Sequence, residues 1–324
     1  MRRRTLLAEG MALLGTAAAH AQQPGKVHRI GFLWENPKTF PEALAAFRAE
    51  LRRLGYTEGR DLVIEFRWAE GRPDLMREYA EELVRLRVDL IVAPSSVYTS
   101  AAKQATSTIP VIFFSHADPL RTGHVANLAR PGANITGFSL MMTETNAKGL
   151  ELLKEVLPGL TRAAILFDPA TPSHAPGLEA VQHAAPLLGL EIQAVAAPTS
   201  ADYDSAFSAM STQRAQAVLV LSTPLFIAGA KPLAALGLKY RLPSLYGPRE
   251  HVEAGGLMSY SPDRADLWRR GAGYVDQVLK GAKPGDLPVQ QPTKFQLAIN
   301  LKTAKAIGIA IPQSFLARAD EVIE

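Results

Sequence analysis

Several apolar, β-rich runs of this sequence are followed directly by side chains that suit the binding of a small charged molecule. Ser95 and Ser96 precede a helical stretch, so their hydroxyls and the first amides of that helix form a site suited to a carboxylate. The alternative is that these serines only cap the helix. Trp34 and Asn36 follow the first run, and the indole of Trp34 either stacks on an apolar ligand group or packs beneath its own loop.

A second group of candidates lies in the segment Ser115-His-Ala-Asp-Pro119. We expect the imidazole of His116 to face the ligand. Asp118 stands before a proline, where aspartate commonly fixes a turn, so a turn role competes with direct ligand contact.

The second half of the chain repeats this arrangement, with Asp168, Thr223, Tyr246 and Glu250 following predicted strands. A carboxylate from this half would neutralise a ligand ammonium group while the first half holds the ligand carboxylate. The two charges of an α-amino acid would then bridge the halves. Tyr260 lies near a predicted crossing of the chain between them.

These side chains are positioned by an alternation of short apolar runs with longer segments of helical periodicity, which is typical of α/β proteins with mostly parallel sheets. In such sheets ligands bind beyond the carboxyl ends of the strands. The alternation restarts near residue 163, so we predict two Rossmann-like lobes. The predicted strands are 27–34, 62–68, 88–93, 109–114, 134–139, 163–167, 190–195, 217–221, 243–246 and 295–299, and the predicted helices are 41–54, 73–86, 100–106, 144–157, 175–188, 203–212 and 264–280.

The C-terminal fifth is too short to form a third lobe, so we predict that the chain returns to the first lobe before it ends in the second. This gives an N-terminal lobe of residues 27–140 and 262–287, a C-terminal lobe of residues 141–260 and 290–324, and a three-segment hinge between them.

Residues 1–21 are expected to form an export signal, because three arginines precede a short apolar run that ends in an A-x-A cleavage site at Ala21. Glu9 interrupts the apolar run, and the arginine pair also weakly resembles a twin-arginine signal. The chain has no cysteine, which excludes a lipid-anchored lipoprotein. We therefore expect a periplasmic protein.

The composition excludes several other classes. The formal charge is +4, and removal of residues 1–21, which hold three arginines and one glutamate, would leave +2. Lys and Arg are interspersed with Asp and Glu, so nucleic-acid binding gains no support. No cofactor is expected, because P-loop and G-x-G-x-x-G motifs are missing. The histidines are not spaced as metal ligands, so no metal site is expected.

Six segments resemble the tryptophan/tyrosine-type group of ABC-transporter substrate-binding proteins, and the resemblance extends from Val27 to the C-terminus in the same order. The segments are Arg67-Trp-Ala-Glu-Gly71, Ala105-Thr-Ser-Thr-Ile-Pro110, Asp118-Pro119, Arg130-Pro-Gly-Ala-Asn-Ile-Thr-Gly137, Glu253-Ala-Gly-Gly-Leu-Met-Ser-Tyr260 and Gln291-Pro-Thr-Lys-Phe-Gln-Leu-Ala-Ile-Asn-Leu-Lys-Thr-Ala-Lys305.

This resemblance implies a type I periplasmic binding protein, whose two lobes are joined by three strands and close over a small ligand for delivery to a membrane permease. Ligands in the group are amino acids, aromatic ones in the best-known members. The sequence departs from the group at Trp34, where small residues are usual, at His116, and at Ser261, where glycine is usual. We expect a monomer. A sensory binding protein that presents its ligand to a receptor is an alternative.

An exported hydrolase is a further alternative, because Ser95, His116 and Asp118 would form a catalytic triad if the fold brought them together. The G-x-S-x-G and H-E-x-x-H motifs are missing, however. We therefore expect no enzymatic activity.

Overall fold

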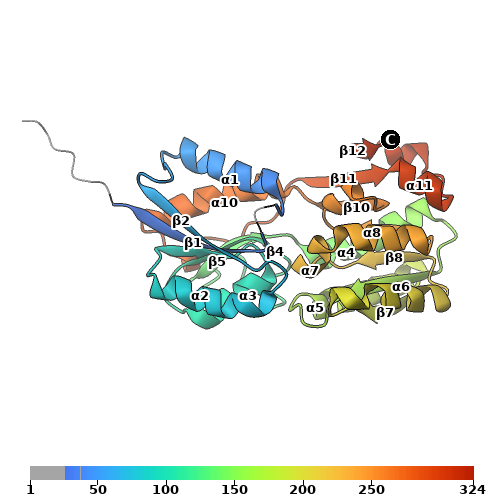
Figure 1. The fold of residues 1–324 in the computed structure, drawn as a ribbon, viewed down its shortest axis with the longest axis horizontal. Coiled ribbons are helices and arrows are strands. Elements are labelled where there is room, and N and C mark those ends of the chain that lie inside the picture. The colour runs from blue at the N-terminus through green and yellow to red at the C-terminus, as the bar shows by residue number, and fades with distance from the viewer. Residues whose placement is uncertain (1–25, 37) are drawn as a thin grey trace, which may run out of the picture.

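The computed structural model of this chain describes residues 26–36 and 38–324. The predicted signal peptide lies outside the described residues. The chain forms two lobes that lie side by side, each built on one sheet (Figure 1). No helix in these two described ranges has the length and apolar character needed to cross a bilayer.

The first lobe contains a five-stranded sheet with the order β2-β1-β3-β4-β5, in which every pairing is parallel. Its elements are β1 (His28–Trp34), α1 (Pro41–Arg53), β2 (Leu62–Trp68), η1 (Pro73–Leu75), α2 (Met76–Arg85), β3 (Leu90–Val92), α3 (Ser96–Ala105), β4 (Val111–His116), β5 (Ile135–Ser139), α10 (Arg264–Leu279) and η4 (Pro284–Asp286).

Helices α1 and α10 cover one face of this sheet, and α2 and α3 cover the other (Figure 1). Every residue of β3, β4 and β5 is buried, as expected for parallel strands with helices on both faces. The centre of the core is aromatic. Trp268 of α10 lies 5.7 Å from Phe32 and 5.7 Å from Phe114 between ring centroids, so a helix distant in sequence completes this core.

The second lobe contains a seven-stranded sheet with the order β12-β11-β10-β9-β8-β6-β7. Only the pairing of β10 with β11 is antiparallel within it. Its elements are α4 (Met142–Val156), β6 (Arg162–Phe167), α5 (His174–Ala184), η2 (Ala185–Leu188), β7 (Glu191–Ala196), η3 (Ser200–Asp202), α6 (Tyr203–Thr212), β8 (Ala217–Val220), α7 (Pro224–Ala228), α8 (Ala230–Lys239), β9 (Ser244–Tyr246), α9 (Glu250–Glu253), β10 (Met258–Pro262), β11 (Phe295–Asn300), α11 (Leu301–Ile307), α12 (Gln313–Leu316) and β12 (Glu321–Ile323).

Three crossings of the chain join the lobes: from β5 into α4, from β10 into α10, and from η4 into β11. The crossings hydrogen-bond to one another. The amide of Ser139 donates to the carbonyl oxygen of Gln290 at 2.9 Å, and the amide of Asp263 donates to that of Lys294 at 3.0 Å. Such a hinge lets the lobes rotate while each stays rigid.

The structure differs from the sequence prediction at several helix and strand ends. Helix α3 begins at Ser96 instead of residue 100, because Ser95 acts as its N-cap and accepts the amide of Tyr98 at 3.4 Å. The helices α7, α8 and α9 and the strands β10 and β12 were not predicted. After β11 the chain ends in two short helices, α11 and α12, followed by β12.

Candidate functional site

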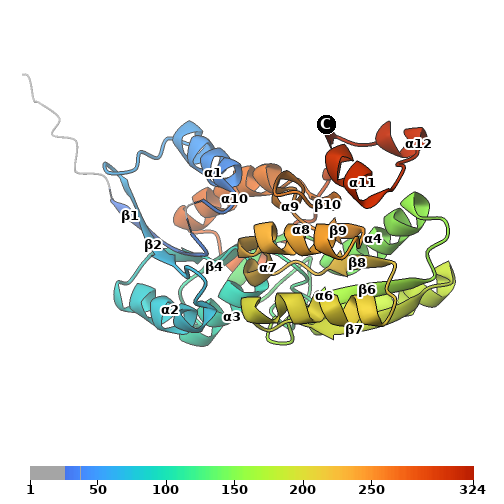
Figure 2. The same cartoon turned by 45° about the vertical axis from the view of Figure 1, so that its right-hand side comes forward.

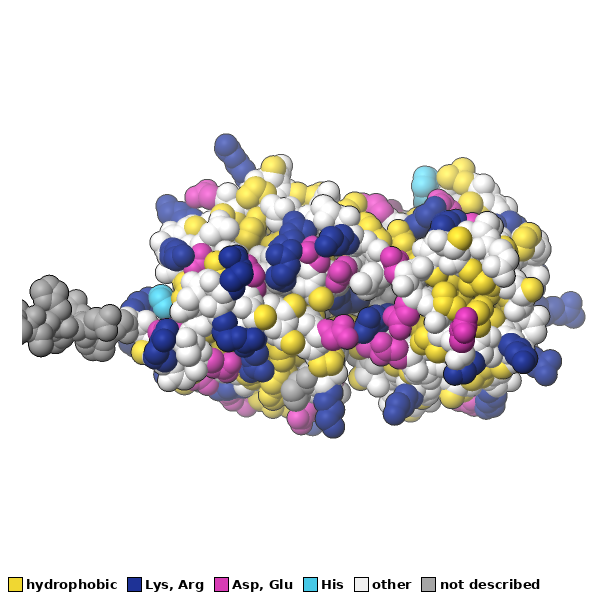
Figure 3. Space-filling view, turned by 90° about the horizontal axis from the view of Figure 1, so that it is seen from above, with side chains coloured by type: hydrophobic (Ala, Val, Ile, Leu, Met, Phe, Trp, Pro, Cys, Tyr) yellow, Lys and Arg dark blue, Asp and Glu magenta, His cyan; other side chains and the backbone are white. Residues whose placement is uncertain are grey.

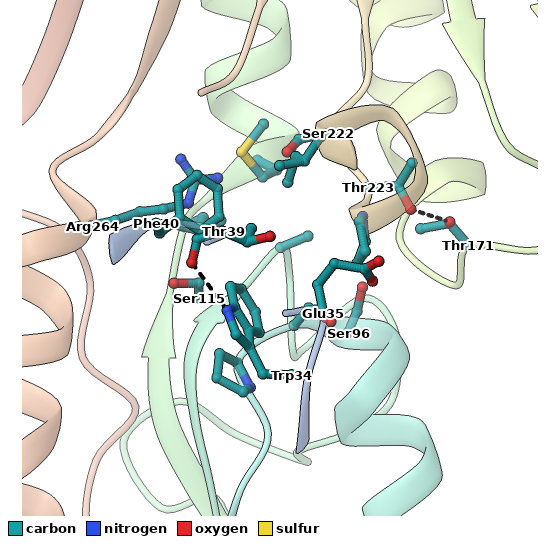
Figure 4. A pocket seen from close by; sticks show the side chains of 17 residues that line it. Trp34, Glu35, Thr39, Phe40, Ser96, Ser115, Thr171, Ser222, Thr223 and Arg264 are labelled. Atoms are coloured by element: carbon teal, nitrogen blue, oxygen red, sulfur yellow. Dashed lines mark hydrogen bonds between the residues drawn. The ribbon is translucent and has the colours of Figure 1, made fainter. Parts of the chain in front are cut away.

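A cavity of about 30 Å³ lies between the two lobes, beyond the carboxyl ends of the strands (Figure 4). The first lobe contributes the loops after β1, β3 and β4, the second contributes the loops after β6 and β8, and the hinge contributes residues from two crossings. The residues that line it are Trp34, Glu35, Thr39, Phe40, Pro94, Ser95, Ser96, Ser115, Ala117, Leu140, Met142, Thr171, Ser222, Thr223, Pro224, Ile227 and Arg264.

Trp34 forms part of the apolar wall. Its indole is buried, lies edge-on to Tyr98 at 5.8 Å and to Trp268 at 5.2 Å, and donates from Nε1 to the carbonyl oxygen of Thr39 at 3.2 Å. The two interpretations of Trp34 are therefore compatible, because the ring packs within the lobe and also lines the cavity.

Glu35 places a buried carboxylate at the cavity, and the sequence prediction omits it. Oε2 accepts the hydroxyl of Tyr98 at 2.7 Å, and Oε1 accepts the amide of Gly71 at 2.7 Å. Burial and the charge of Glu35 both raise the pKa of Tyr98, so the phenol stays a donor. Within the described ranges Glu35 forms no salt bridge. The signal for it was available, because it follows β1 directly.

Ser95 and Ser96 both line the cavity, as predicted, and both also have structural roles. Ser95 caps α3. The hydroxyl of Ser96 hydrogen-bonds to that of Ser173 in the second lobe at 3.2 Å, so this contact crosses the cleft. Thr223 also lines the cavity from the second lobe, and its hydroxyl hydrogen-bonds to that of Thr171 at 2.9 Å.

Arg264 supplies the positive charge at the cavity, and the sequence prediction omits it too. Its guanidinium lies over the ring of Phe40 at 4.6 Å. The Nε atom is buried without a hydrogen-bond partner among the described residues, and Nη1 reaches the hydroxyl of Ser261 only at 3.5 Å. Burial lowers the pKa of Arg264, and the charge of Glu250 opposes this effect. No simple signal marks Arg264, because it follows a hinge strand and not a loop of the sheet's binding edge.

The structure places the side chains of His116, Asp168 and Tyr246 outside the residues that line this cavity. The ring of His116 is fully buried and its Nε2 lies 2.7 Å from Nδ1 of His124. Tyr246 is fully buried in the second-lobe core and stacks on His251 at 4.4 Å. Asp168 turns back on its own loop, where its carboxylate accepts the hydroxyl of Thr171 at 2.7 Å and the amide of Ala170 at 2.9 Å.

Four other predicted residues also lie outside this cavity. The side-chain oxygen of Asn36 accepts a hydrogen bond from the backbone amide of Lys38 in a turn. Asp118 accepts the amide of Arg121 at 3.0 Å and the hydroxyl of Thr143 at 2.7 Å, which matches its alternative role in a turn. Tyr260 stacks on Phe295 at 5.5 Å in the hinge strands. Glu250 lines a neighbouring chamber.

The structure does not assemble the triad on which the hydrolase alternative depends. In the described part of the chain, Ser95, His116 and Asp118 make no hydrogen bond to one another, because each is engaged with other partners. The described residues also contain no group of three or more acidic or histidine side chains arranged to hold a metal ion.

Two buried histidines near the site, His124 and His174, are expected to make the stability of the fold depend on pH. Burial lowers the pKa of His124 and of His174 to about 4. The unfolded-state pKa is about 6.5, so their stabilising contribution is complete above that pH and is lost as the pH falls towards 4. We expect the free energy of unfolding to fall by on the order of 2 kcal/mol per histidine between pH 7 and pH 5, as measured by urea denaturation.

The control substitution for this pH dependence, at His183, lies on the same helix as His174. The variant His174→Gln should show a smaller fall in stability on acidification than the unsubstituted protein. The variant His183→Gln, at an exposed position of α5, should keep the full fall. Equal pH dependence in all three proteins would contradict the assignment.

The family model described as ABC transporter substrate binding protein matches residues 39–323. The chain belongs to this family. A tyrosine-binding protein of Clostridioides difficile (strain R20291) is 25% identical over 280 residues, which cover 86% of this chain and 80% of that protein.

Two solved structures of similar proteins share the fold closely. A conserved domain protein from Vibrio cholerae O1 biovar El Tor has a TM-score of 0.86 and 26% identity, and the match covers 92% of this chain and 100% of that one. The ABC domain in complex with L-Trp from Streptococcus pneumonia has a TM-score of 0.84 and 27% identity, and the match covers 91% of this chain and 99% of that one. The family resemblance and the type I two-lobed fold predicted from the sequence are therefore confirmed.

Proposed function

We propose that this ABC transporter substrate-binding protein binds an α-amino acid with an aromatic or other apolar side chain and delivers it to its permease. The observation that carries the proposal is the charge pattern of the cleft cavity. Its apolar wall is accompanied by a carboxylate, Glu35, and a guanidinium, Arg264, neither of which forms a salt bridge within the described residues. An α-amino acid supplies both missing charges and an apolar group.

The relatives support this class of substrate. One curated relative is a tyrosine-binding protein, and one similar structure is a complex with L-Trp. The apolar wall of the cavity includes Trp34, Phe40 and Met142 here, which suits a flat or apolar side chain.

Substrate binding would be coupled to closure of the lobes. A cavity of about 30 Å³ is far smaller than the roughly 300 Å³ at the lower end of ligand pockets, so the lobes must separate to admit a substrate. Contacts across the cleft then favour the closed arrangement. These include an ion pair between Arg121 and Glu179 at 2.6 Å and one between Arg249 and Glu42 at 2.9 Å. A substrate that touches both lobes shifts the equilibrium towards closure by its differential affinity.

The proposed location of the protein in the cell rests on its N-terminal segment. The proposal includes export, cleavage after Ala21 and a free periplasmic monomer whose lobes are residues 27–140 with 262–287 and 141–260 with 290–324. The sequence supports it through the apolar run of the signal and the absence of cysteine.

The first test is thermal unfolding of the mature protein after denaturation and refolding, which removes ligand carried over from purification. The panel contains the twenty amino acids together with benzoate and D-glucose. A ligand at a hundred times its dissociation constant should stabilise the protein by about 2.7 kcal/mol, and we expect this shift with L-tryptophan or L-tyrosine. Stabilisation by benzoate or glucose alone would contradict the proposed substrate class.

A further inference from the structure

Two buried imidazoles lie against one another in the first lobe, and neither lines the cleft cavity. His116 ends β4, and His124 belongs to the loop of residues 117–125 that follows it. Nε2 of His116 lies 2.7 Å from Nδ1 of His124, and the two residues are 0% and 8% exposed. His116 is also a position at which the sequence departs from the group that it resembles. The pair therefore needs an explanation other than contact with the substrate.

A neighbouring hydroxyl decides which nitrogen of each ring carries a proton. Oγ of Ser100 lies 3.0 Å from the carbonyl oxygen of Ser96 and 2.9 Å from Nε2 of His124. A carbonyl oxygen only accepts, so Ser100 donates to Ser96 and accepts the N–H of His124. A neutral imidazole has one N–H, so Nδ1 of His124 is an acceptor and Nε2 of His116 donates to it. One relay of hydrogen bonds therefore extends from β4 through the loop to α3.

This relay has no place for a second proton. A proton on Nδ1 of His124 would bond to the hydroxyl oxygen of Thr122 at 3.0 Å, but it would also face the N–H of His116. If His116 instead carries its proton on Nδ1, that atom is buried and has no hydrogen-bond partner among the described residues. Either arrangement leaves a buried donor unpaired, which costs free energy. Protonation therefore breaks the link between β4 and α3.

The charged groups of the surrounding elements leave the pair neutral. Helix α3 carries Lys103, whose ammonium donates to the carbonyl oxygen of His124 at 3.3 Å. The loop carries Asp118 and Arg121, and β4 and β5 contain no Asp, Glu, Lys or Arg. Burial lowers the pKa of both imidazoles, to about 4 for His124, where the charge of Lys103 adds to the effect. Both rings are therefore uncharged at pH 7 in the closed arrangement.

The segments that the pair joins all make contacts with the second lobe. On α3, the hydroxyl of Ser96 forms the hydrogen bond across the cleft that is described above. In the loop, the carboxylate of Asp118 accepts the hydroxyl of Thr143 at 2.7 Å, and Arg121 forms an ion pair with Glu179 at 2.6 Å. Release of the loop from α3 would therefore weaken three contacts between the lobes together.

The pair also lies beside the first crossing of the chain between the lobes. The carbonyl oxygen of His116 accepts the amide of Leu140 at 2.7 Å, and that of Ala117 accepts the amide of Met142 at 2.9 Å. Figures 1 and 2 show α3 on the side of the first lobe that faces the second lobe. Figure 3 looks onto the opposite face, of α1 and α10, where acidic and basic side chains gather at the junction. A change at the pair therefore acts on the junction from the side of α3.

We propose that the His116–His124 pair is a proton-operated switch, which holds the lobes closed while it is neutral and lets them open when it takes up a proton. In the open arrangement the loop and the start of α3 lose their contacts with the second lobe, so the pair reaches water and a proton on it is solvated. Acidification then favours the open state, because the state that binds the proton more tightly gains population.

The sign of the effect on substrate binding follows from the pKa values. The pKa of His124 is about 4 in the closed state and rises towards the ordinary value of about 6.5 on opening. Substrate affinity is therefore complete above about pH 6.5 and is lost as the pH falls towards 4. This readout rests on the function proposed above, whereas the opening of the lobes does not.

The test measures substrate affinity and lobe opening at pH 7 and pH 5. The double variant His116→Gln/His124→Gln keeps amide groups at both positions but cannot titrate, and His183→Gln is the exposed control. In the unsubstituted protein and in His183→Gln, the affinity for L-tryptophan should fall about tenfold between pH 7 and pH 5. The radius of gyration of the substrate-free protein, from small-angle X-ray scattering, should increase over the same range. The double variant should show neither change.

His174 provides a second comparison, because it is a buried histidine of the second lobe whose pKa is also lowered to about 4. The variant His174→Gln should keep the pH dependence of the affinity, since the relay does not include it. If the double variant responds to acid as the unsubstituted protein does, or if His174→Gln loses the response, the inference is wrong.

The ¹⁵N resonances of the imidazole rings give a readout in the unsubstituted protein, which does not depend on the folding of any variant. Both rings of the pair should be neutral at pH 7, with the proton on Nε2, and L-tryptophan should move their titration to lower pH. Titration at the same pH with and without bound L-tryptophan overturns the switch. If no amino acid binds, the proposed function fails, and an unchanged radius of gyration between pH 7 and pH 5 would then overturn this inference separately.

Discussion

Replacing Arg264 by methionine should lower the affinity for the amino-acid substrate about a hundredfold, or about 2.7 kcal/mol. The substitution removes the only positive charge that lines the cleft cavity within the described residues, and it leaves the substrate carboxylate buried without a counter-ion. The unfolding free energy should not fall with the affinity. The Nε atom of Arg264 is buried and has no hydrogen-bond partner among the described residues, so an apolar side chain against Phe40 suits the substrate-free protein at least as well.

The measurement is calorimetric titration with L-tryptophan and tryptamine, together with urea denaturation of each protein without substrate. Tryptamine has no carboxylate, so Arg264→Met should leave its affinity unchanged or raise it. Arg269→Met is the control, because Arg269 lies on the same helix but is exposed and pairs with Asp266 at 2.7 Å. A loss of affinity for both probes, accompanied by a lower unfolding midpoint, would show that Arg264 acts through the fold and not through the carboxylate.

The architecture was predictable from the sequence because its signal is repeated many times along the chain. Buried runs such as residues 111–114 and Ala217–Val220 are apolar at every position, and amphipathic helices separate the strands. The return of the chain to the first lobe was also predictable, because the segment after Pro262 is too short to fold alone. Short elements were missed: β12 has three residues, and its pairing with β11 is a tertiary effect that local sequence does not encode.

The loops of the site were predictable, but the direction of their side chains was not. The rule that ligands bind beyond the carboxyl ends of parallel strands led to loops that line the cavity, after β1, β3 and β8. Within a loop, however, a polar side chain that satisfies nearby backbone groups is indistinguishable in sequence from one that faces a ligand. Asp168 and Asn36 cap their own turns, whereas Glu35, next to Asn36, faces the cavity. Polar pattern alone could not separate them.

The hinge contributes more to the site than the sequence suggested. The crossing between β10 and α10 carries Arg264 to the cavity, and α10 then returns to complete the aromatic core that supports Trp34. The same segment therefore joins the lobes, places a positive charge at the cavity and supports the wall of the cavity behind it. A change in lobe angle would move Arg264 relative to the second lobe, so the proposed substrate binding and the closure of the lobes would be coupled through this segment.

The largest loss of stability is expected from Trp268→Ala, at about 4 kcal/mol of unfolding free energy. The indole is fully buried, contacts Phe32 and Phe114, and donates from Nε1 to the hydroxyl of Ser115 at 2.9 Å. Its removal leaves a cavity and an unpaired hydroxyl in the centre of the first lobe. It also removes the support of Trp34 and releases Ser115, both of which line the cleft, so substrate affinity should fall as well.

Urea denaturation followed by far-ultraviolet circular dichroism measures this loss, with Trp68→Ala as the matched control. Trp68 is only partly buried and stacks on Phe66 at 4.7 Å at the edge of the first sheet, so its truncation should cost about 1 kcal/mol. Trp268→Phe keeps most of the buried volume and should recover more than half of the lost stability. Equal losses for Trp68→Ala and Trp268→Ala would mean that α10 is not an integral part of the first lobe, and that the aromatic core does not depend on the returning segment of the chain.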